Sequence, residues 1–454
     1  MKYFPYTDYK SVDNLIGRIP NGWRVERLHD VATIKTSNVD KKSAKYDAPV
    51  KLCNYVDVYY HSKITSEIDF MISTASENEI ERFTLHAGDV VFTKDSEDPY
   101  DIGIPTLIKE EIENLVCGYH LSIVKPELSQ IIGGFVYYAL ETELSKFQFT
   151  LASNGVTRFG LTYQGTKNLL LPIPSLDEQK SIVDFLDYKI VQINRLIDKK
   201  KELIEKLNEQ RITMITQAVT KGIDLNVTMK NTEVNWLGDI PKHWGIKRLR
   251  FAIESNPVKS EINDIERDDL VSFVPMNAVG EYGGIRLDIN KPLNDVYDGY
   301  TYFRNDDVVI AKITPCFENG KGAKAEYLTN GIAFGTTELH VMRPLEGYSS
   351  RWLFYLSICH AFREIGASEM YGAGGQKRVP ESFIKNFRLG IPSYEEQESI
   401  ADFIDTETQK INDMLRVNNQ AIDRLIEYKK ALISSTVTGQ IDVRGVEIPN
   451  KEVA

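Results

Sequence analysis

The sequence predicts a protein of the α+β class, in which two mixed α/β bodies in tandem are separated by an antiparallel pair of long coiled-coil helices with pseudo-two-fold symmetry. Three observations predict this architecture. The 454 residues exceed the length at which one hydrophobic core keeps growing, so two or more domains are expected. Much of the sequence is an internal repeat of two copies, and each copy ends in a long stretch with the apolar spacing of a helix.

Two pairs of segments carry the repeat. Residues Ile16–Leu28 read IGRIPNGWRVERL, and residues Leu237–Leu249 read LGDIPKHWGIKRL. Further along, IPSLDEQKSIVDFLD at Ile173–Asp187 returns as IPSYEEQESIADFID at Ile391–Asp405. The period is about 220 residues, far above the 20–50 residues of solenoid repeats, so the chain is a tandem duplication of one large unit.

Each copy consists of a short head segment, a globular body and a helical region. The predicted boundaries are a head segment at 1–22, a first body at 23–172, a central helical region at 173–225, a linker with the repeated head at 226–243, a second body at 244–390, a C-terminal helical region at 391–446 and a terminal segment at 447–454.

The two bodies share a framework and differ in their loops. Asp89–Lys94 corresponds to Asp307–Lys312, and both segments are typical of a strand that enters a loop. Each body then predicts one helix with a single apolar stripe, formed by Val136, Leu140, Leu144 and Phe147 in the first body and by Phe354, Ile358, Phe362 and Ile365 in the second. Divergent loops on a common framework favour two binding modules with different targets; drift after duplication is the alternative.

Each helical region begins with the same signal. Ser175 precedes Glu178 by three residues, and Ser393 precedes Glu396 by three, as in a capping box. A four-three apolar spacing then predicts a coiled-coil helix of about 44 residues in each copy. The first seam is Leu186, Ile190, Ile193, Ile197, Lys200, Ile204, Leu207, Arg211, Met214 and Ala218, and the second is Ile404, Thr408, Ile411, Leu415, Asn418, Ile422, Leu425, Lys429, Leu432 and Thr436.

The main polar interruptions fall at the same positions of the two seams, Lys200 and Arg211 in one and Asn418 and Lys429 in the other. Polar seam residues often specify register at a cost in stability. One such helix cannot bury its stripe alone, so we expect the two helices to pair with each other. An antiparallel pair is expected, and a parallel pair is the alternative.

Composition limits the function. The net charge of −11 argues against a protein that binds DNA unaided through phosphate neutralisation, although the second body is nearly neutral and the first is several charges negative. No apolar run is long enough to span a bilayer, and the start of the chain does not look like a signal peptide. The four cysteines, at 53, 117, 316 and 359, form no CxxC pair and are expected to be reduced thiols in a cytoplasmic protein.

No catalytic, cofactor or metal motif is recognisable. The seven histidines stand without HExxH or similar ligand spacing, and neither a GxGxxG nor a GxxxxGK[ST] phosphate loop is present. Asp98-Pro99-Tyr100 is a partial match to the motif of adenine methyltransferases, but a proline is missing and we interpret it as a turn. We therefore expect no catalytic residue, metal or cofactor in this chain.

The order and duplication of these motifs resemble the specificity subunit of type I restriction-modification enzymes, over essentially the whole chain. The resemblance rests on the Ile-Pro-x-x-Trp-x-x-x-Arg-Leu head, the Pro-x-Pro or Gly-x-Pro entry to each helical region, the Glu-Gln pair and the Ile-x-x-Phe-hydrophobic-Asp helix. It implies that each body is a target recognition domain for one half of a split DNA site, and that the paired helices set the spacing. It further implies two methyltransferase subunits that bring S-adenosylmethionine and methylate adenine, and allows two motor-nuclease subunits that use ATP and magnesium.

Two kinds of site are expected on this chain. The candidate DNA-binding residues lie in the loop after the shared strand and in a Gly-x-x-Arg loop, where Gly155 and Arg158 are matched with Gly375 and Arg378. They are Lys94, Asp95, Gly155 and Arg158 in the first body, and Lys312, Asn319, Lys321, Gly375, Gln376, Lys377 and Arg378 in the second. For each of them a solvated surface loop is the alternative.

The candidate partner-binding residues recur on the opening turns of both helices. They are Glu178, Gln179, Asp184, Asp187, Glu396, Gln397, Asp402 and Asp405. Helix capping explains Glu178 and Glu396 without a partner. Trp23 and Trp244 are expected to anchor head to helix by packing.

Two rival functions remain open at this point. A single-chain methyltransferase or nuclease needs a cofactor or metal motif, and would be revived by stoichiometric binding of S-adenosylmethionine. A coiled-coil scaffold or adaptor without DNA recognition predicts bodies that act as interchangeable spacers.

Overall fold

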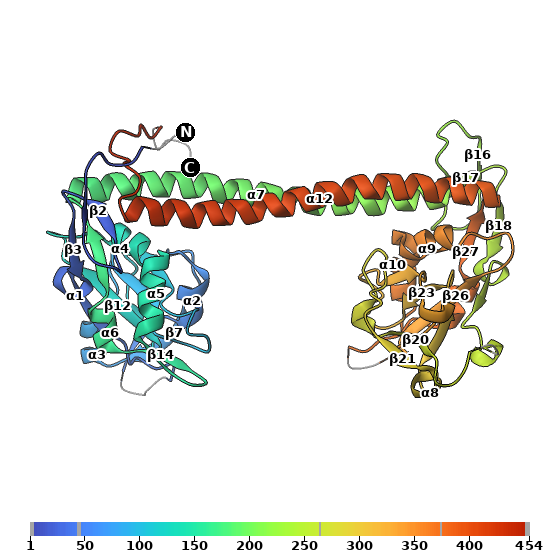
Figure 1. The fold of residues 1–454 in the computed structure, drawn as a ribbon, viewed down its shortest axis with the longest axis horizontal. Helices are drawn as coiled ribbons and strands as arrows, with labels where there is room; N and C mark the ends of the chain where they lie inside the picture. The colour runs from blue at the N-terminus through green and yellow to red at the C-terminus, as the bar shows by residue number, and fades with distance from the viewer. Residues whose placement is uncertain (1–3, 43–46, 263–264, 373–374, 450–454) are drawn as a thin grey trace. The chain divides into compact units, whose positions relative to one another are not determined.

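The computed structural model describes residues 4–42, 47–262, 265–372 and 375–449 (Figure 1). The chain divides into two compact units: unit 1 contains Met1–Lys199 with Gln420–Ala454, and unit 2 contains Lys200–Asn419. Each unit contains one body and parts of two long helices, α7 (Leu176–Lys221, 46 residues) and α12 (Tyr394–Val437, 44 residues). Unit 1 is therefore assembled from both ends of the chain.

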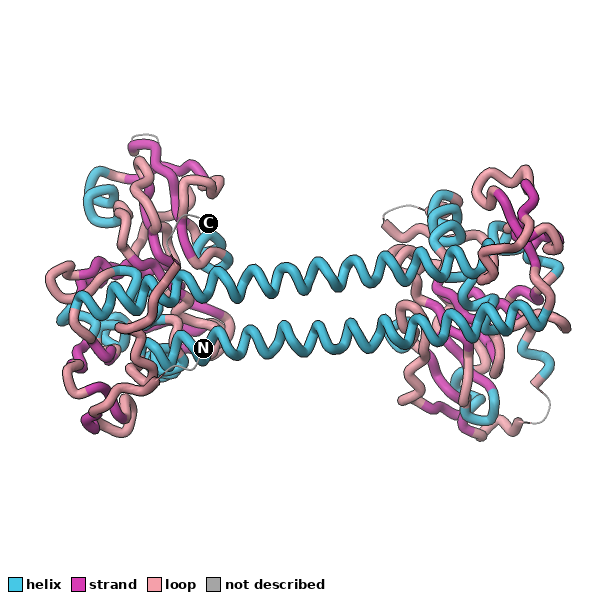
Figure 2. Tube along the Cα trace, turned by 90° about the horizontal axis from the view of Figure 1, so that it is seen from above, coloured by secondary structure: helices cyan, strands magenta, loops and turns pink. Residues whose placement is uncertain are grey.

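Within each unit the segments of α7 and α12 lie side by side (Figure 2), and their cross-helix hydrogen bonds show that they run antiparallel, as predicted. In unit 1, Lys429 Nζ on α12 donates to Asn194 Oδ1 on α7 over 3.2 Å. In unit 2, Arg211 Nη1 donates to Asn412 Oδ1 over 3.1 Å. Lysine or arginine on one helix thus meets asparagine on the other, and the residue numbers rise on α7 as they fall on α12.

The predicted seams form the interface of these helices. Every seam position is buried or half-buried. The polar interruptions are satisfied across the pair, since Lys200 Nζ donates to Asn418 Oδ1 over 3.0 Å in unit 2. These bonds allow the polar residues to lie in an apolar seam, and they select one register of the two helices.

The body of unit 1 is built on two sheets. The larger one has the strand order β4-β12-β8-β10-β6 and the smaller one β11-β5-β7. These strands are β4 (Ala32–Thr36), β12 (Leu121–Pro126), β8 (Val90–Thr93), β10 (Pro105–Ile108), β6 (Lys63–Ile64), β11 (Leu115–Cys117), β5 (Ala48–Cys53) and β7 (Met71–Ala75). The short helices α1 (Leu28–Val31), α2 (Tyr55–Tyr60), α3 (Glu77–Phe83) and α6 (Tyr163–Lys167) connect them.

The body of unit 2 repeats this framework in two four-stranded sheets, ordered β19-β26-β23-β24 and β21-β20-β25-β22. Their strands are β19 (Ile253–Ser255), β26 (Leu339–Pro344), β23 (Val308–Ala311), β24 (Gly322–Lys324), β21 (Asn290–Pro292), β20 (Leu270–Val274), β25 (Ile332–Gly335) and β22 (Thr301–Arg304). The short helices α8 (Leu293–Val296) and α11 (Glu381–Asn386) complete the body.

Strands β8 and β23 are equivalent, and each is central in its sheet. All four residues of each strand are buried, as expected for a strand covered on both faces. A buried carboxylate precedes each strand and pairs with a cation on the neighbouring strand. Asp307 accepts two hydrogen bonds from Arg343, at 2.7 and 2.8 Å. In unit 1, Asp89 Oδ2 lies 3.4 Å from Lys125 Nζ.

The single helix predicted after the sheet is wrong in both bodies, because the helix is broken in two. In unit 1 it forms α4 (Gly133–Leu140) and α5 (Glu143–Ala152), and in unit 2 α9 (Ser350–Ile358) and α10 (His360–Ser368). Thr142 has extended backbone and its side chain caps α5 by accepting from Ser145 N, so a new helix starts there.

The head segments form small antiparallel ladders. In unit 1, β1 (Tyr9–Ser11) pairs with β2 (Arg18–Pro20), and β3 (Arg24–Arg27) pairs with β15 (Leu170–Ile173). In unit 2, β16 (Met229–Asn231) pairs with β17 (Asp239–Pro241), and β18 (Gly245–Arg248) pairs with β27 (Arg388–Ile391). The second ladder of each unit joins the start of the body to the entry of the long helix.

Candidate nucleic-acid interface

The predicted DNA-binding loops meet at the end of the central strand in each body. Beyond β8, the backbone N–H of Lys94 donates to His120 O over 2.9 Å. Beyond β23, the N–H of Lys312 donates to Glu338 O over the same distance. His120 and Glu338 directly precede the neighbouring strands β12 and β26, so they occupy equivalent places. We call the region around Lys94 and His120 in unit 1, and the region around Lys312 and Glu338 in unit 2, the strand-end corners.

In unit 1 the strand-end corner is formed by an aspartate, a histidine and an arginine. Asp95 Oδ2 lies 2.7 Å from His120 Nδ1, and Arg158 Nη2 donates to Asp95 Oδ1 over 2.6 Å. The Asp95 side chain is 14% exposed, whereas that of Arg158 is 60% exposed. The hydrogen bond from Arg158 and the charge of Asp95 raise the pKa of the guanidinium. The arginine is therefore held at one point and is otherwise open to solvent.

In unit 2 the corner consists of an arginine and a glutamate. Arg378 Nε donates to Glu338 Oε2 over 2.9 Å and Arg378 Nη2 to Glu338 Oε1 over 2.7 Å. This bidentate pair raises the pKa of Arg378 and lowers the pKa of Glu338. The Arg378 side chain is 41% exposed, so the edge that does not face the glutamate is accessible.

The match of Arg158 with Arg378 in the two Gly-x-x-Arg loops is wrong by two residues. Strands β9 (Asp95–Ser96), β13 (Ser153–Gly155) and β14 (Phe159–Leu161) place Gly160 opposite Asp95. In unit 2, Arg378 itself stands opposite Ile313, the residue equivalent to Asp95. Arg158 lies in the bend just before β14, two residues ahead of Gly160, and both arginines nevertheless reach an acid at the same corner.

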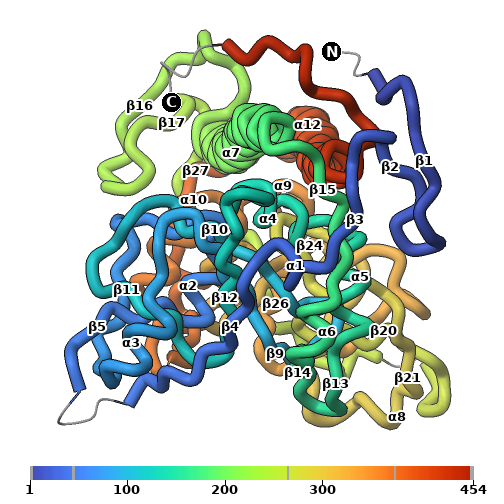
Figure 3. Tube along the Cα trace, turned by 90° about the vertical axis from the view of Figure 1, so that its left-hand side faces the viewer, coloured from blue at the N-terminus to red at the C-terminus, as the bar shows by residue number. Residues whose placement is uncertain are grey.

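Figure 3 shows where this corner lies in unit 1. Strands β9, β13 and β14 are at the end of the body opposite α7 and α12. Gly155 lies in β13 with φ +153°, and a Cβ there would be 2.0 Å from Arg158 O. Glycine is therefore needed where β13 enters the bend that carries Arg158.

Each corner borders a recess of different chemistry. The recess of unit 1, of about 480 Å³, is lined by carboxylates and tyrosines: Tyr55, Val56, Tyr59, Tyr60, Asp95, Ser96, Glu97, Asp98, Asp101, His120 and Arg158. The rings of Tyr55 and Tyr59 stack with centroids 5.7 Å apart, and a hydrogen bond to Asp101 raises the pKa of Tyr59 to about 12. Asp98-Pro99-Tyr100, predicted as a turn, lies at the rim, and the Tyr100 N–H donates to Asp98 Oδ1 over 2.9 Å.

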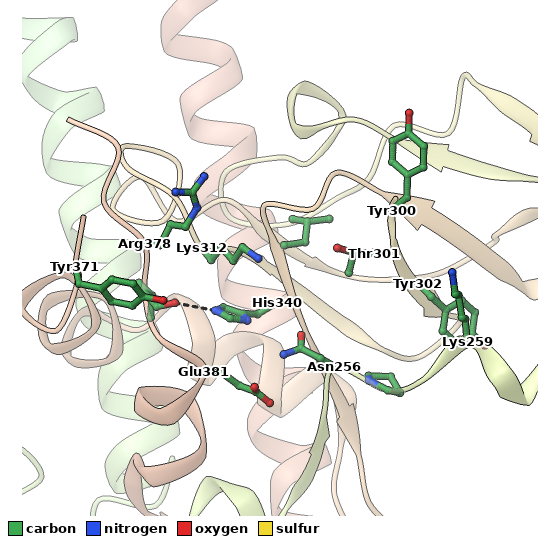
Figure 4. Close-up of a pocket in the computed structure, with 13 residues that line it drawn as sticks. Asn256, Lys259, Tyr300, Thr301, Tyr302, Lys312, His340, Tyr371, Arg378 and Glu381 are labelled. Atoms are coloured by element: carbon green, nitrogen blue, oxygen red, sulfur yellow. Dashed lines mark hydrogen bonds between the residues drawn. The ribbon is translucent and has the colours of Figure 1, made fainter. Parts of the chain in front are cut away.

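The recess of unit 2 is basic and has a volume of about 440 Å³ (Figure 4). Arg378, Lys312 and Tyr371 lie on one side of it, and Lys259, Tyr300 and Tyr302 on the other. At its base the buried His340 lies with Nε2 2.9 Å from Val379 O. Burial lowers the pKa of this imidazole.

The remaining predicted DNA-binding residues are dispersed around these corners. Lys94 is partly withdrawn, because its Nζ donates to Ser37 O over 3.3 Å and lies 4.3 Å from the centre of the Tyr119 ring. Burial lowers the pKa of this lysine. Its equivalent, Lys312, makes no hydrogen bond or ion pair through its ammonium group with the described residues.

Asn319 and Lys321 lie away from Arg378, beside a different loop. Asn319 Nδ2 is 3.5 Å from Glu281 Oε1, and Lys321 Nζ donates to Met276 O over 3.4 Å. Gly375, Gln376 and Lys377 are exposed residues that lead into Arg378. Lys312 and Arg378 thus line the same recess, whereas Asn319 and Lys321 contact Glu281 and Met276 outside its lining.

The predicted partner-binding residues are largely engaged within the chain. Gln179 Oε1 accepts from Ile132 N over 3.0 Å, and Gln397 Oε1 accepts from Ser349 N over 2.8 Å, each at the start of a body helix. Both amides are fully buried, so they fix the long helix to the body from inside. These contacts explain the recurrence of the glutamines without a partner.

The aspartates of that set differ in their partners and in their exposure. Asp187 accepts from Lys63 Nζ over 3.0 Å, and Asp405 is bonded to both Arg351 and Tyr355. Asp402 accepts from Arg351 over 2.8 Å but remains exposed, as does Asp184. The exposed carboxylates stay as predicted docking residues.

The capping boxes are half confirmed. Ser175 Oγ accepts from Glu178 N over 3.4 Å, and Ser393 Oγ accepts from Glu396 N over 3.3 Å. The glutamate side chains turn to the head segments instead of the serine backbone. Glu178 accepts from the Tyr6 hydroxyl, and Glu396 accepts from the Trp244 indole.

Trp23 and Trp244 pack between the heads and the ends of the long helices, as predicted. They are 2% and 1% exposed. A Cβ at Gly439, just beyond α12, would lie 3.3 Å from the Trp23 ring, and one at Gly222, just beyond α7, would lie 3.4 Å from the Trp244 ring. Each tryptophan therefore joins its head to the end of a helix that begins in the other unit.

Sequence reasoning missed His120 and Glu338, which hold the two arginines. Their signal is positional, since both directly precede the strand that pairs with the shared central strand. In the described part of the chain, no three His, Cys, Asp or Glu side chains are grouped to hold a metal ion. Among the helices described, none is long and apolar enough to cross a membrane.

The framework, the corners and the long helices together define a protein built from two related α/β bodies on duplicated helical regions. A family model described as the type I restriction modification DNA specificity domain matches residues 20–206 and 263–424, more than half of the chain. The chain therefore belongs to this family of DNA specificity domains.

Individual relatives agree with this assignment. The EcoAI specificity subunit of Escherichia coli is 42% identical over 164 residues, 36% of this chain and 27% of that protein, so the chain spans about a quarter of that relative's length. A putative MjaX specificity subunit from Methanocaldococcus jannaschii is 22% identical over 98% of this chain and 99% of the relative. A solved chain from a type I R-M system shares the fold, with a TM-score of 0.71 at 17% identity over 93% of this chain and 99% of the other.

Proposed function

We propose that this chain is the non-catalytic specificity subunit of a type I restriction-modification complex, in which each body reads one half of a bipartite DNA site. One observation carries the proposal: the two units repeat the same framework but differ at the strand-end corner. The corner of unit 1 borders an acidic, tyrosine-lined recess, and that of unit 2 a basic one. Equivalent placement with different chemistry suits two readers of different half-sites.

The partners follow from the family. Double-stranded DNA is the target, and two methyltransferase subunits bind the helical regions, supply S-adenosylmethionine and methylate an adenine in each half-site. Two motor-nuclease subunits that use ATP and magnesium join where unmodified DNA is cleaved. The complex acts in the cytoplasm, and this chain holds no cofactor of its own. Exposed carboxylates on the opening turns, Asp184 and Asp402 among them, are docking candidates.

The charge of the chain supports an assembly rather than a solitary DNA-binding protein. With a net charge of −11, the chain cannot neutralise many phosphates. We expect weak DNA binding by the purified chain and steep salt dependence only for the complex with methyltransferase.

The paired helices support a role in spacing. Their polar pairs specify a single register, so the two helices cannot slide past each other without breaking those bonds. Lengthening α7 and α12 in step by one heptad is expected to lengthen the gap between the half-sites. An unchanged gap would contradict the spacing role.

A body exchange tests the proposal as a whole. Residues 23–172 are replaced by the corresponding body of a relative, the chimera is expressed with its methyltransferase, and methylated adenines are mapped across the genome. Recognition bodies change one half of the motif and leave the other half unchanged. A motif that does not change would favour a scaffold without DNA recognition.

A further inference from the structure

The arginines of the two corners share an arrangement that the proposed function does not by itself explain. Each is exposed and is fixed by an acid that does not cover it. Arg378 uses Nε and one Nη2 hydrogen on Glu338, so the edge formed by Nη1 and the second Nη2 hydrogen meets no acceptor among the described residues. Arg158 uses one Nη2 hydrogen on Asp95 Oδ1, and the nearby His120 Nδ1 is itself engaged with Asp95 Oδ2. The second Nη2 hydrogen, Nε and Nη1 therefore meet no acceptor in the described part of the chain.

Such an arginine suits a rigid ligand with two neighbouring acceptors. Its donors point in one plane, and the acid restricts the rotation of the side chain before the ligand arrives. In DNA, two groups offer paired acceptors to arginine: the N7 and O6 atoms of guanine in the major groove, and the oxygens of a backbone phosphate.

In unit 1 the electrostatics of the corner favour the base over the phosphate. The carboxylates of Glu97, Asp98 and Asp101 line the recess beside Arg158 and would repel a phosphate. A guanine edge carries no net charge, so it keeps its hydrogen bonds to the arginine without this repulsion. In unit 2 the recess is basic, and Glu338 offsets only the charge of Arg378 itself, so there the case for a base rests on the fixed geometry of the guanidinium.

We propose that Arg158 and Arg378 each read a guanine in the half-site bound by their own body, with Asp95 and Glu338 as positioning residues that orient the guanidinium. The inference rests on the proposed function and assigns one base contact to each body. It also predicts that Asp95→Asn and Glu338→Gln, which keep the shape but remove the charge, weaken reading at the same guanine as the arginine substitution.

The experiment compares motifs of the complete complex. Wild type and the variants Arg158→Ala, Arg158→Lys, Arg378→Ala and Arg378→Lys are each expressed with the methyltransferase, and methylated adenines are mapped. Each arginine variant is expected to relax one guanine position, in one half-site only, with a loss of discrimination of about ten- to hundredfold. Lysine should fail as alanine does, because a single ammonium cannot make the paired contact.

Two exposed, ion-paired arginines serve as matched controls. Arg24 lies 3.8 Å from Glu26 in unit 1, and Arg286 lies 2.7 Å from Asp288 in unit 2. Their alanine variants should leave the motif unchanged. Thermal unfolding of each purified variant shows whether the bodies remain folded, and the Asp95→Asn and Glu338→Gln variants test the same positions without loss of volume.

The outcomes separate the two proposals. If the wild-type complex modifies no bipartite motif, the proposed function fails. If the motif exists but the arginine variants of folded protein lower methylation equally at every site, the arginines contact phosphate and the inference alone is overturned. If the motif and the rate of methylation are both unchanged, these arginines contact neither a guanine nor a phosphate.

Discussion

The indole Nε1 of Trp244 donates a hydrogen bond to Glu396 Oε2 over 3.0 Å, at the first turn of α12. Trp23, its equivalent in unit 1, is equally buried, but its Nε1 has no hydrogen-bond partner among the described residues. In unit 1 the equivalent glutamate, Glu178, accepts a hydrogen bond from the Tyr6 hydroxyl instead. The two heads are therefore attached to their helices by different polar contacts at the same place.

This difference predicts unequal effects of one substitution. Trp244→Phe removes a hydrogen bond to a charged group, a contact that contributes about 1.5–3 kcal/mol when buried and less here because Glu396 is partly exposed. Trp23→Phe removes similar volume but no hydrogen bond. Denaturant unfolding of the full chain should show the larger loss of unfolding free energy for Trp244→Phe. Equal losses would mean that the Glu396 contact adds nothing.

A second prediction concerns the close contact between α4 and the loop before β8. A Cβ at Gly133 would lie 1.9 Å from Gly88 O, which is backbone and cannot turn aside. Gly133→Ala should lower the free energy of unfolding by about 1–3 kcal/mol or more. Gly22→Ala is the control, since a Cβ there meets nothing within 4 Å. Thermal melts of both variants in parallel check the contrast.

The polar pair in the helix seam of unit 2 predicts a measurable coupling. Lys200 and Asn418 are half-buried and hydrogen-bonded, so Asn418→Leu leaves the ammonium without its acceptor and should destabilise the chain. The double variant with Lys200→Leu should recover that loss, because leucine fits an apolar seam. A double-mutant cycle is expected to give a coupling of about 0.5–1 kcal/mol, and strict additivity would contradict it.

His340 predicts a dependence of stability on pH. Burial lowers its pKa in the folded chain, Lys312 adds to the lowering, and Glu338, Glu381 and the Val379 carbonyl oppose it. The unfolded chain therefore takes up the proton first. Stability is fully present above the unfolded pKa of about 6.5 and is lost as the pH falls toward the folded value.

The measurement is denaturant unfolding at pH 7.5 and pH 5.5. His340→Gln keeps a donor for Val379 O without titrating in this range, so it should show a smaller fall between the two pH values than the wild type. His360→Gln, at an exposed position, should behave as the wild type does. If the unfolding free energies of the wild type and of His340→Gln fall equally between pH 7.5 and pH 5.5, His340 is not the source of the pH dependence.

Features that depend on periodicity could be predicted from the sequence. The seams of α7 and α12 follow a 3.5-residue repeat, and Lys200 and Asn418 stand out as polar residues within it. The pairing of the two helices follows because the other copy offers a matching stripe, whereas the stripe alone leaves both a parallel and an antiparallel direction open. The break between α4 and α5 could not be predicted in this way, because Thr142 restarts the helix without interrupting the apolar spacing.

The sequence allows the loops of the corners to be predicted, but not the contacts that their residues make. The glycine-arginine loops were recognised, yet their apparent match hides a two-residue shift, since register is set by hydrogen bonds across a ladder and not by motif spelling. His120 meets Arg158 only after the sheet brings together residues that are 38 positions apart in the chain. Contacts of that kind follow from the fold and leave no local pattern.

The division of the helices between the units has a consequence for biosynthesis. Unit 2 is continuous in sequence and is fully translated by Asn419, whereas unit 1 also needs Gln420–Ala454, which are translated later. Until then the apolar stripe of α7 in unit 1 has no partner, and the nascent chain must keep it from aggregating. The unit whose body is made first is therefore completed after the other, and a chain interrupted just after Asn419 holds a complete unit 2 and an incomplete unit 1.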